Sequence, residues 1–211
     1  MAENKLQIQY DELTKRLKSL CVKFIDTHKD PLETPDQYDL DVQSYCILSH
    51  AGFEEFFESI CIYILSTIDS NFNLPSRNIS IGTICLLHFD CASQNLDDKW
   101  DSNGLLNDYL YKKITERKSV LSKYAIDGNH GADIKYLKKL LLPIGIDIPH
   151  DVDYVNALEK LKDIRGTYAH SFSRAKKTTS PEDAKAIVND VLRLAQNLKD
   201  QAINMKFFPT K

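Results

Sequence analysis

The stretch Ser44-Tyr-Cys-Ile-Leu-Ser-His-Ala-Gly-Phe-Glu-Glu-Phe-Phe-Glu58 decides the fold of this chain. It lies within residues 41–69, where apolar side chains recur at helical spacing. The apolar residues that cluster on one side of this predicted helix are Phe53, Phe56, Phe57, Ile60 and Ile64. The other side carries Glu54, Glu55, Glu58 and Ser59. A helix that is apolar over so wide an arc usually lies at the centre of a bundle.

Further helices are predicted on both sides of this central one. Apolar residues repeat at helical spacing in four more segments, which are residues 5–26, 105–124, 134–142 and about 151–168. Ser180-Pro-Glu-Asp183 starts a last helix, because serine is a good cap and proline is favoured at the first helical position. The two prolines of residues 30–37 are expected to end the first helix, and Asp39 or Asp41 to cap the second.

Residues 79–89 fit either a short strand or a buried helical piece, because periodicity alone does not separate the two. The other segments are helical, and the sequence shows no internal repeat. We therefore predict an all-α, up-down bundle of five or six helices.

The composition is that of one soluble domain. The chain has 211 residues, and we expect a single domain over residues 1–211 with its core at about 5–203. A hydrophobic fraction of 43% and a charged fraction of 27% are ordinary. The net charge of −3 argues against a large duplex-binding surface, because dedicated nucleic-acid binders carry an excess of lysine and arginine. A small site acting on one RNA loop stays open.

The cysteines and the apolar runs indicate in which cellular compartment the protein is expected. The five cysteines contain no CxxC pair and most lie in apolar runs, so they are predicted to be buried thiols in a reducing cytosol. Residues 1–5 lack the apolar core of a signal peptide. The longest apolar run, Ile60–Leu65, is far shorter than the roughly 20 residues that span a bilayer. We expect a cytoplasmic protein without membrane contact.

The candidate site is Asp163-Ile-Arg-Gly-Thr-Tyr-Ala-His-Ser171, near the end of a predicted helix. Arginine is a permanent cation that suits phosphate, and histidine titrates near neutral pH. On a regular helix Arg165 and His170 point about 140° apart. A joint role therefore requires that His170 lies past the last helical turn, or that a two-fold dimer brings two pairs together. Tyr168 lies near the face of Arg165.

Other interpretations of these residues compete with catalysis. An arginine near an aspartate on a helix is most often a surface ion pair, and a histidine near a helix C-terminus often complements the dipole. His50, Glu54 and Glu58 recur every four residues, but a metal site in a bundle needs a matching second helix, which the sequence lacks. We predict no metal and no cofactor. Basic residues at 112–123 and 135–139 fit a solvated face, whereas the loop residues Arg174, Lys176 and Lys177 are better candidates for RNA contact.

Four stretches carry a resemblance to a known family. Arg165-Gly-Thr-Tyr-Ala-His170 matches the R-x4-6-H pattern of the HEPN superfamily. Residues 44–58 resemble the central "LSHA…E" helix of its RiboL-PSP-HEPN branch, and residues 129–145 resemble the turn and short helix before a "LG" stop. The cap at Ser180 and the final helix also fit. The resemblance covers about residues 5–203.

The resemblance implies a homodimeric, metal-independent endoribonuclease, typically a toxin or anti-phage effector with an antitoxin or another defence-system protein as partner. In such an enzyme the ribose 2′-OH attacks the adjacent phosphate and leaves a 2′,3′-cyclic phosphate. Arg165 would bind the phosphate and His170 would act as general base or acid. The supporting residues that it suggests are Glu54, Tyr168 and Ser171.

Two positions depart from the family pattern. Many catalytic members carry a polar residue directly after the arginine, where this chain has Gly166. Phe172 stands where members silenced by nucleotide transfer have a tyrosine. The alternative function is a non-catalytic HEPN module that binds RNA, a nucleotide or a partner protein, and Gly166 and the acidic balance favour it.

Overall fold

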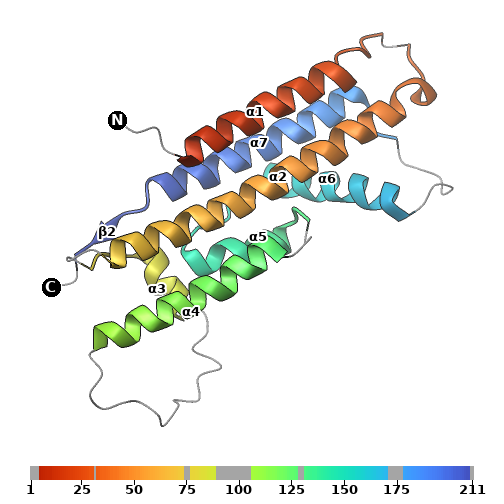
Figure 1. Cartoon of the computed structure of the whole chain (residues 1–211). Coiled ribbons are helices and arrows are strands. Elements are labelled where there is room, and N and C mark those ends of the chain that lie inside the picture. Colours follow the sequence, from red (N-terminus) through yellow and green to blue (C-terminus); the bar gives the residue numbers. More distant parts are fainter. Residues whose placement is uncertain are drawn as a thin grey trace.

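We describe the fold from a computed structural model of the chain (Figure 1). The structure describes residues 5–30, 32–73, 77–88, 106–127, 131–170 and 178–209, and of residues 106–107 and 167–170 it describes the backbone alone. Seven α-helices carry the fold in these ranges, so the predicted all-α class is confirmed. They are α1 (Lys5–Phe24), α2 (Pro35–Phe72), α3 (Ile81–His88), α4 (Leu106–Asp127), α5 (Ile134–Leu141), α6 (Val152–His170) and α7 (Pro181–Ile203).

The segment after α2 combines both structures that its sequence allows. β1 (Ile79–Ser80) pairs antiparallel with β2 (Phe207–Phe208), and α3 follows β1 directly. A strand of two residues is too short to build a sheet, so it only ties the chain end to this segment. The additional helix α3 is the reason that the structure has seven helices where five or six are expected.

Helix α2 lies at the centre of the bundle, as predicted. It packs against α1 and α7 on one side and against α4, α5 and α6 on the other (Figure 1). Its side chains Phe53, Phe57 and Ile60 are fully buried. Although α2 is 38 residues long, no helix in the described ranges is both long and apolar enough to cross a membrane.

The start of α2 differs from the prediction. Neither Asp39 nor Asp41 is its cap, because the helix already begins at Pro35 and Thr34 occupies the capping position. The Thr34 amide donates to Oε1 of Gln37 over 2.8 Å, which closes half of a capping box. Proline is tolerated here because the first helical amide has no partner within the helix. Pro35 thus begins the second helix and does not merely separate it from the first.

A tight junction fixes α3 against the end of α5. After α5 a short 3-10 turn, η2 (Leu142–Ile144), leads to Gly145, which has a left-handed φ of 75°. A Cβ atom at Gly145 would lie 2.9 Å from the backbone nitrogen of Gly82 in α3. Both glycines therefore permit a backbone approach that no side chain would allow.

Three of the cysteines are buried as predicted, and Cys85 is half-buried; Cys91 lies outside the described residues. Cys46 and Cys61 lie on α2, and burial raises the pKa of each thiol to about 12. These two thiols therefore stay protonated near neutral pH and behave as small apolar side chains.

His28 connects the end of α1 to α2 and predicts a pH dependence of stability. Its Nδ1 lies 2.7 Å from Glu33 and its Nε2 lies 2.9 Å from Asp41. The hydrogen bond to Asp41, opposed by burial and helped by Glu33, raises the pKa of His28. The folded chain therefore holds this proton more tightly, so the stabilisation is complete below about pH 6.5 and disappears as pH rises through the folded pKa.

We expect His28→Gln to lower the free energy of unfolding more at pH 5.5 than at pH 8.5, as measured by urea denaturation. The exposed His150 provides the control, since His150→Gln removes a histidine without carboxylate partners in the described structure. An equal loss at both pH values for His28→Gln would contradict the prediction.

Candidate functional site

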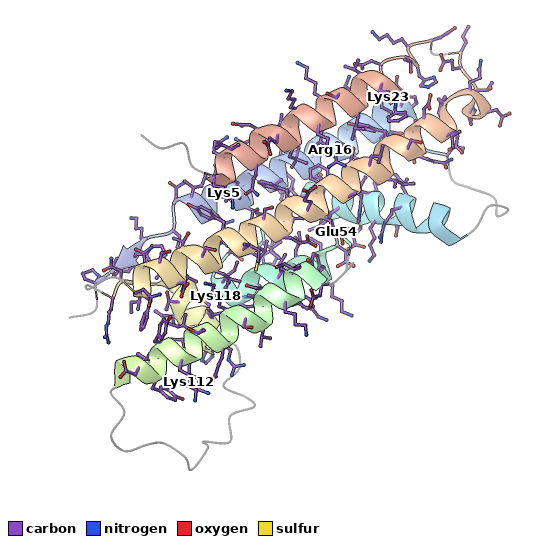
Figure 2. All side chains as sticks on the ribbon, viewed as in Figure 1. Lys5, Arg16, Lys23, Glu54, Lys112 and Lys118 are labelled. Carbon is purple, nitrogen blue, oxygen red and sulfur yellow. The ribbon has the colours of Figure 1, made fainter. Side chains whose placement is uncertain are left out.

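The turn Gly131–Asp133, directly before α5, lies where α2 and α6 approach each other. Its first amide, that of Gly131, donates to Oε1 of Glu54 over 2.6 Å. The next amide, that of Ala132, donates to Nε2 of His50 over 3.1 Å. Figure 2 labels Glu54 on the side of α2 that faces this turn. Two side chains of α2, one helical turn apart, therefore bind two consecutive amides of the turn.

Asp133 connects the same turn to α5 and α6. Its carboxylate accepts a 2.7 Å hydrogen bond from the Tyr136 amide and so caps α5. It also lies 3.2 Å from Nζ of Lys162 on α6. Burial alone would raise the pKa of Asp133, but the Tyr136 amide and the Lys162 ammonium together lower it. The turn is thus bound on one side by α2 and on the other by α6.

Arg165 lies against this turn. A Cβ atom at Gly131 would lie 3.4 Å from Nη1 of Arg165 and 3.5 Å from Cε1 of His50, so guanidinium and imidazole border the same small space. Arg165 follows Lys162 by three residues and lies on the same face of α6. One face of α6 therefore directs two cations at the turn.

His50 is a buried, neutral histidine in this arrangement. Only 1% of its surface is exposed, and Nε2 accepts a hydrogen bond, so in the neutral ring the proton is on Nδ1. Burial, followed by the charge of Arg165, lowers the pKa of His50, while Glu54 and Asp133 act in the opposite direction. Near neutral pH the ring is uncharged and does not repel Arg165.

Glu58, one helical turn after Glu54, extends the polar contacts of α2 towards α5 and α4. The hydroxyl of Tyr136 donates to Glu58 over 3.2 Å, and the ring of Tyr136 lies 5.9 Å from that of Tyr124. Burial raises the pKa of Glu58 to about 6. By contrast, the Glu55 side chain is 75% exposed and the Glu54 side chain only 13%. Periodicity places these carboxylates together on one polar side of α2. In the structure this side is not uniformly solvated, because the turn and α5 cover part of it.

The predicted site residues divide into three groups. The guanidinium of Arg165 lies beside the turn, and Glu54 accepts a hydrogen bond from the Gly131 amide. His170 and Tyr168 lie on α6, and of them the backbone alone is described. The remaining predicted residues lie outside the described residues, and they are Ser171, Arg174, Lys176 and Lys177.

One of the two arrangements considered for the pair is wrong. The backbone of α6 stays helical through His170, so this residue does not lie past the last helical turn. Gly166 does not interrupt the helix either. Arg165 and His170 are therefore five steps apart on a continuous helix, about 140° around its axis. The other arrangement, in which a two-fold dimer brings two Arg165–His170 pairs together, remains for a joint role of the two residues.

The metal site considered for α2 is not formed. His50, Glu54 and Glu58 each bind a different protein donor, as described above. Within the described ranges, no group of three or more histidine, cysteine, aspartate or glutamate side chains is placed to hold a metal ion. His50 and Glu54 bind the turn, and Glu58 binds the Tyr136 hydroxyl of α5.

Part of the basic surface of α4 is neutralised within the molecule. Lys118 pairs with Asp69 of α2, and Lys113 pairs with Glu116. Figure 2 labels Lys112 and Lys118 along α4, at a distance from the labelled Glu54. Lys113 and Lys118 therefore have carboxylate partners within the molecule, whereas Lys112 is exposed.

Three of the four sequence stretches, residues 44–58, 129–145 and 165–170, thus contribute residues to this one site. A model of the RiboL-PSP-HEPN family matches residues 10–204 of the chain. The chain belongs to the RiboL-PSP-HEPN family. Comparisons with curated proteins and with solved structures found no match.

The RiboL-PSP-HEPN stretches supply most of the contacts of the turn, and Lys162, which pairs with Asp133, lies outside them. The "LSHA…E" stretch contributes His50 and Glu54, the stretch from residue 129 contributes the turn itself, and the R-x4-H stretch contributes Arg165. The sequence-based prediction did not include His50, Lys162 or the backbone of Gly131 and Ala132. The sequence signal for His50 is its place in the "LSHA" motif, whereas its spacing to Glu54 and Glu58 alone suggests only a metal ligand.

Proposed function

We propose that this RiboL-PSP-HEPN protein is a metal-independent endoribonuclease that acts as a toxin or anti-phage effector in the cytoplasm. The observation that carries the proposal is the placement of Arg165 of the R-x4-H motif beside the turn Gly131–Asp133, which α2 and α6 bind. A guanidinium held in advance of substrate binding is suited to an anion whose charge grows during reaction.

In the proposed reaction, His170 as general base removes the proton of a ribose 2′-OH. The 2′ oxygen forms a bond to the adjacent phosphorus, and the bond from phosphorus to the 5′ oxygen breaks. The leaving 5′ oxygen takes up a proton from the general acid, for which His170 of a second copy is a candidate. Arg165 binds the phosphoryl oxygens and stabilises their negative charge.

The proposal includes a homodimer. Because α6 remains helical through His170, Arg165 and His170 of one copy diverge around the helix axis. A two-fold axis near the end of α6 would place two such pairs in one cleft. Tyr168 and Ser171 would then lie within the cleft, and the basic residues Arg174, Lys176 and Lys177 would follow the RNA strand. An antitoxin or another defence-system protein is the expected regulatory partner.

The test is RNA cleavage by the purified protein in excess EDTA. We expect fragments that end in a 2′,3′-cyclic phosphate, which accept a 3′ adapter only after the phosphate has been removed enzymatically. Expression in a bacterial host is expected to stop growth and to produce the same ends. Cleavage that disappears on chelation and returns with a divalent metal would reject the metal-independent mechanism.

A non-catalytic HEPN module is the second candidate, and Gly166 favours it. The position after Arg165 carries no side chain that can contact substrate, and a Cβ atom there would meet no described atom within 4 Å apart from its chain neighbours and the surrounding helix backbone. This candidate predicts that the protein binds RNA, a nucleotide or a partner protein but leaves RNA intact in the same assay.

A further inference from the structure

His50 is a buried titratable group for which the proposed reaction has no direct use. It lies on α2, at 1% exposure, and its Nε2 accepts the Ala132 amide over 3.1 Å. Its ring and the guanidinium of Arg165 border the same space beside Gly131. A buried imidazole next to a permanent cation is tolerable only while it is uncharged, because two positive charges in a poorly solvated place repel each other strongly.

We infer that His50 is a positioning residue for Arg165: its unprotonated Nε2 holds the Gly131–Ala132 turn against which the guanidinium lies, and RNA cleavage requires the uncharged ring. This inference rests on the proposed function for its effect on cleavage. The structural coupling between His50 and Arg165 does not depend on that function.

The hydrogen bond explains why His50 acts through the turn. Protonation of Nε2 removes its lone pair, so the buried Ala132 amide loses its acceptor, which is unfavourable for a buried donor. Glu54 binds only the neighbouring amide of Gly131, and its carboxylate lies 4.0 Å from Nδ1 of His50. It therefore does not replace the lost bond. The turn would move, and the surface against which Arg165 rests would move with it.

The charged groups that face the ring come from three elements. Arg165 of α6 disfavours protonation, whereas Glu54 of α2 and Asp133 of the turn favour it. Lys162 of α6 pairs with Asp133 and offsets part of its charge. Burial, followed by the charge of Arg165, lowers the pKa of His50, so the folded pKa lies below the unfolded one. The uncharged His50 ring therefore contributes its full stabilisation of the folded chain above about pH 6.5. This contribution declines as pH falls through the folded pKa of His50.

Two amide substitutions separate the acceptor from the charge. In His50→Gln the side-chain oxygen reaches the place of Nε2 and has no titratable proton. In His50→Asn the shorter side chain ends near the place of Nδ1 and leaves the Ala132 amide without a partner. Both variants are polar and uncharged, so they form a matched pair.

We expect His50→Asn to lower kcat for RNA cleavage about 100-fold, because a misplacement of roughly 1 Å has this effect on a positioned group. KM is expected to change little, since the contact of Arg165 strengthens in the transition state. His50→Gln is expected to restore kcat to nearly the wild-type value. Normal kcat in His50→Asn, or equal losses in both variants, would overturn the inference.

The pH dependence of RNA cleavage provides a second readout. If His50 had a purely structural role, this pH dependence would be the same in the wild type and in His50→Gln. All other titratable groups are common to the two proteins, so the ratio of His50→Gln activity to wild-type activity removes their contribution. We expect this ratio to rise as pH falls from 7.5 to 5, because the wild-type imidazole becomes charged and the amide of the His50→Gln variant does not. A constant ratio would contradict the requirement for an uncharged ring.

An NMR titration tests the coupling without any RNA. The His50 signal, assigned by its absence in His50→Gln, is expected to show the Nδ1-protonated tautomer and to titrate below the ordinary histidine range. In Arg165→Ala it is expected to titrate at a higher pH. An unchanged titration would overturn the coupling. If the wild-type protein cleaves no RNA, the proposed function fails, and this measurement still decides whether His50 and Arg165 are coupled.

Discussion

Arg165→Ala is expected to lower the rate of RNA cleavage by about 100- to 1,000-fold, which is the usual effect of removing one preorganised group that stabilises transition-state charge. His170→Ala is expected to lower it by about 100- to 10,000-fold, because a general acid–base group contributes in this range. Both rates are measured on a short labelled RNA under single-turnover conditions, so that binding and product release do not mask the chemical step.

The controls for this prediction address charge and folding. Arg165→Lys keeps the charge but loses the planar, two-pronged contact with phosphate, so an intermediate rate is expected. Arg193→Ala removes an arginine of α7 whose side chain is 70% exposed and pairs with Asp190, and it is expected to cleave normally. Urea denaturation of each variant verifies the fold. Wild-type cleavage by a folded Arg165→Ala protein would exclude the proposed site.

Gly145→Ala is expected to lower the free energy of unfolding by about 2–5 kcal/mol, the largest stability effect that we expect. The left-handed φ of 75° costs an alanine about 1–2 kcal/mol. The added Cβ would also lie 2.9 Å from the backbone of Gly82, and overpacking of this kind costs about 1–3 kcal/mol. Because both partners are backbone, no rotamer change relieves the contact. Urea denaturation provides the measurement.

Gly166→Ala is the matched control, since it makes the same change at a glycine with an ordinary helical conformation. A Cβ atom there would meet no described atom within 4 Å apart from its chain neighbours and the surrounding helix backbone, so the substitution is expected to stabilise the protein by roughly 0.4–1 kcal/mol. If both variants lost stability equally, the close junction of α3 and η2 would not be the cause of the loss at Gly145.

The helices were largely predictable because their signals are local. The cap at Ser180, confirmed by its hydrogen bond from the Asp183 amide, needs no information from elsewhere in the chain. Pro35 was misinterpreted because a proline between two helices fits a breaker and a first helical residue equally well. The segment after Asn78 was ambiguous because it contains a strand pair made with residues more than a hundred positions away.

The site was less predictable because its contacts join distant parts of the chain. The motif identified Arg165, but nothing in the spacing indicates that its guanidinium lies beside Gly131. Glu54 and Glu55 are adjacent acidic residues on the polar side of the predicted helix, yet one accepts a hydrogen bond from a buried amide and the other is exposed. Which part of a polar helix face becomes covered depends on the tertiary arrangement, and periodicity carries no such information.

The reactivity of the two buried thiols of α2 reports the transient opening of this helix. Cys46 and Cys61 lie on either side of His50 and Glu54 along α2, and both are fully buried. A thiol reagent reaches a buried, protonated cysteine only during transient opening of the surrounding structure. The rate of alkylation at these two positions therefore reports how often α2 separates from its neighbours, and with it how long the turn beside Arg165 persists between openings.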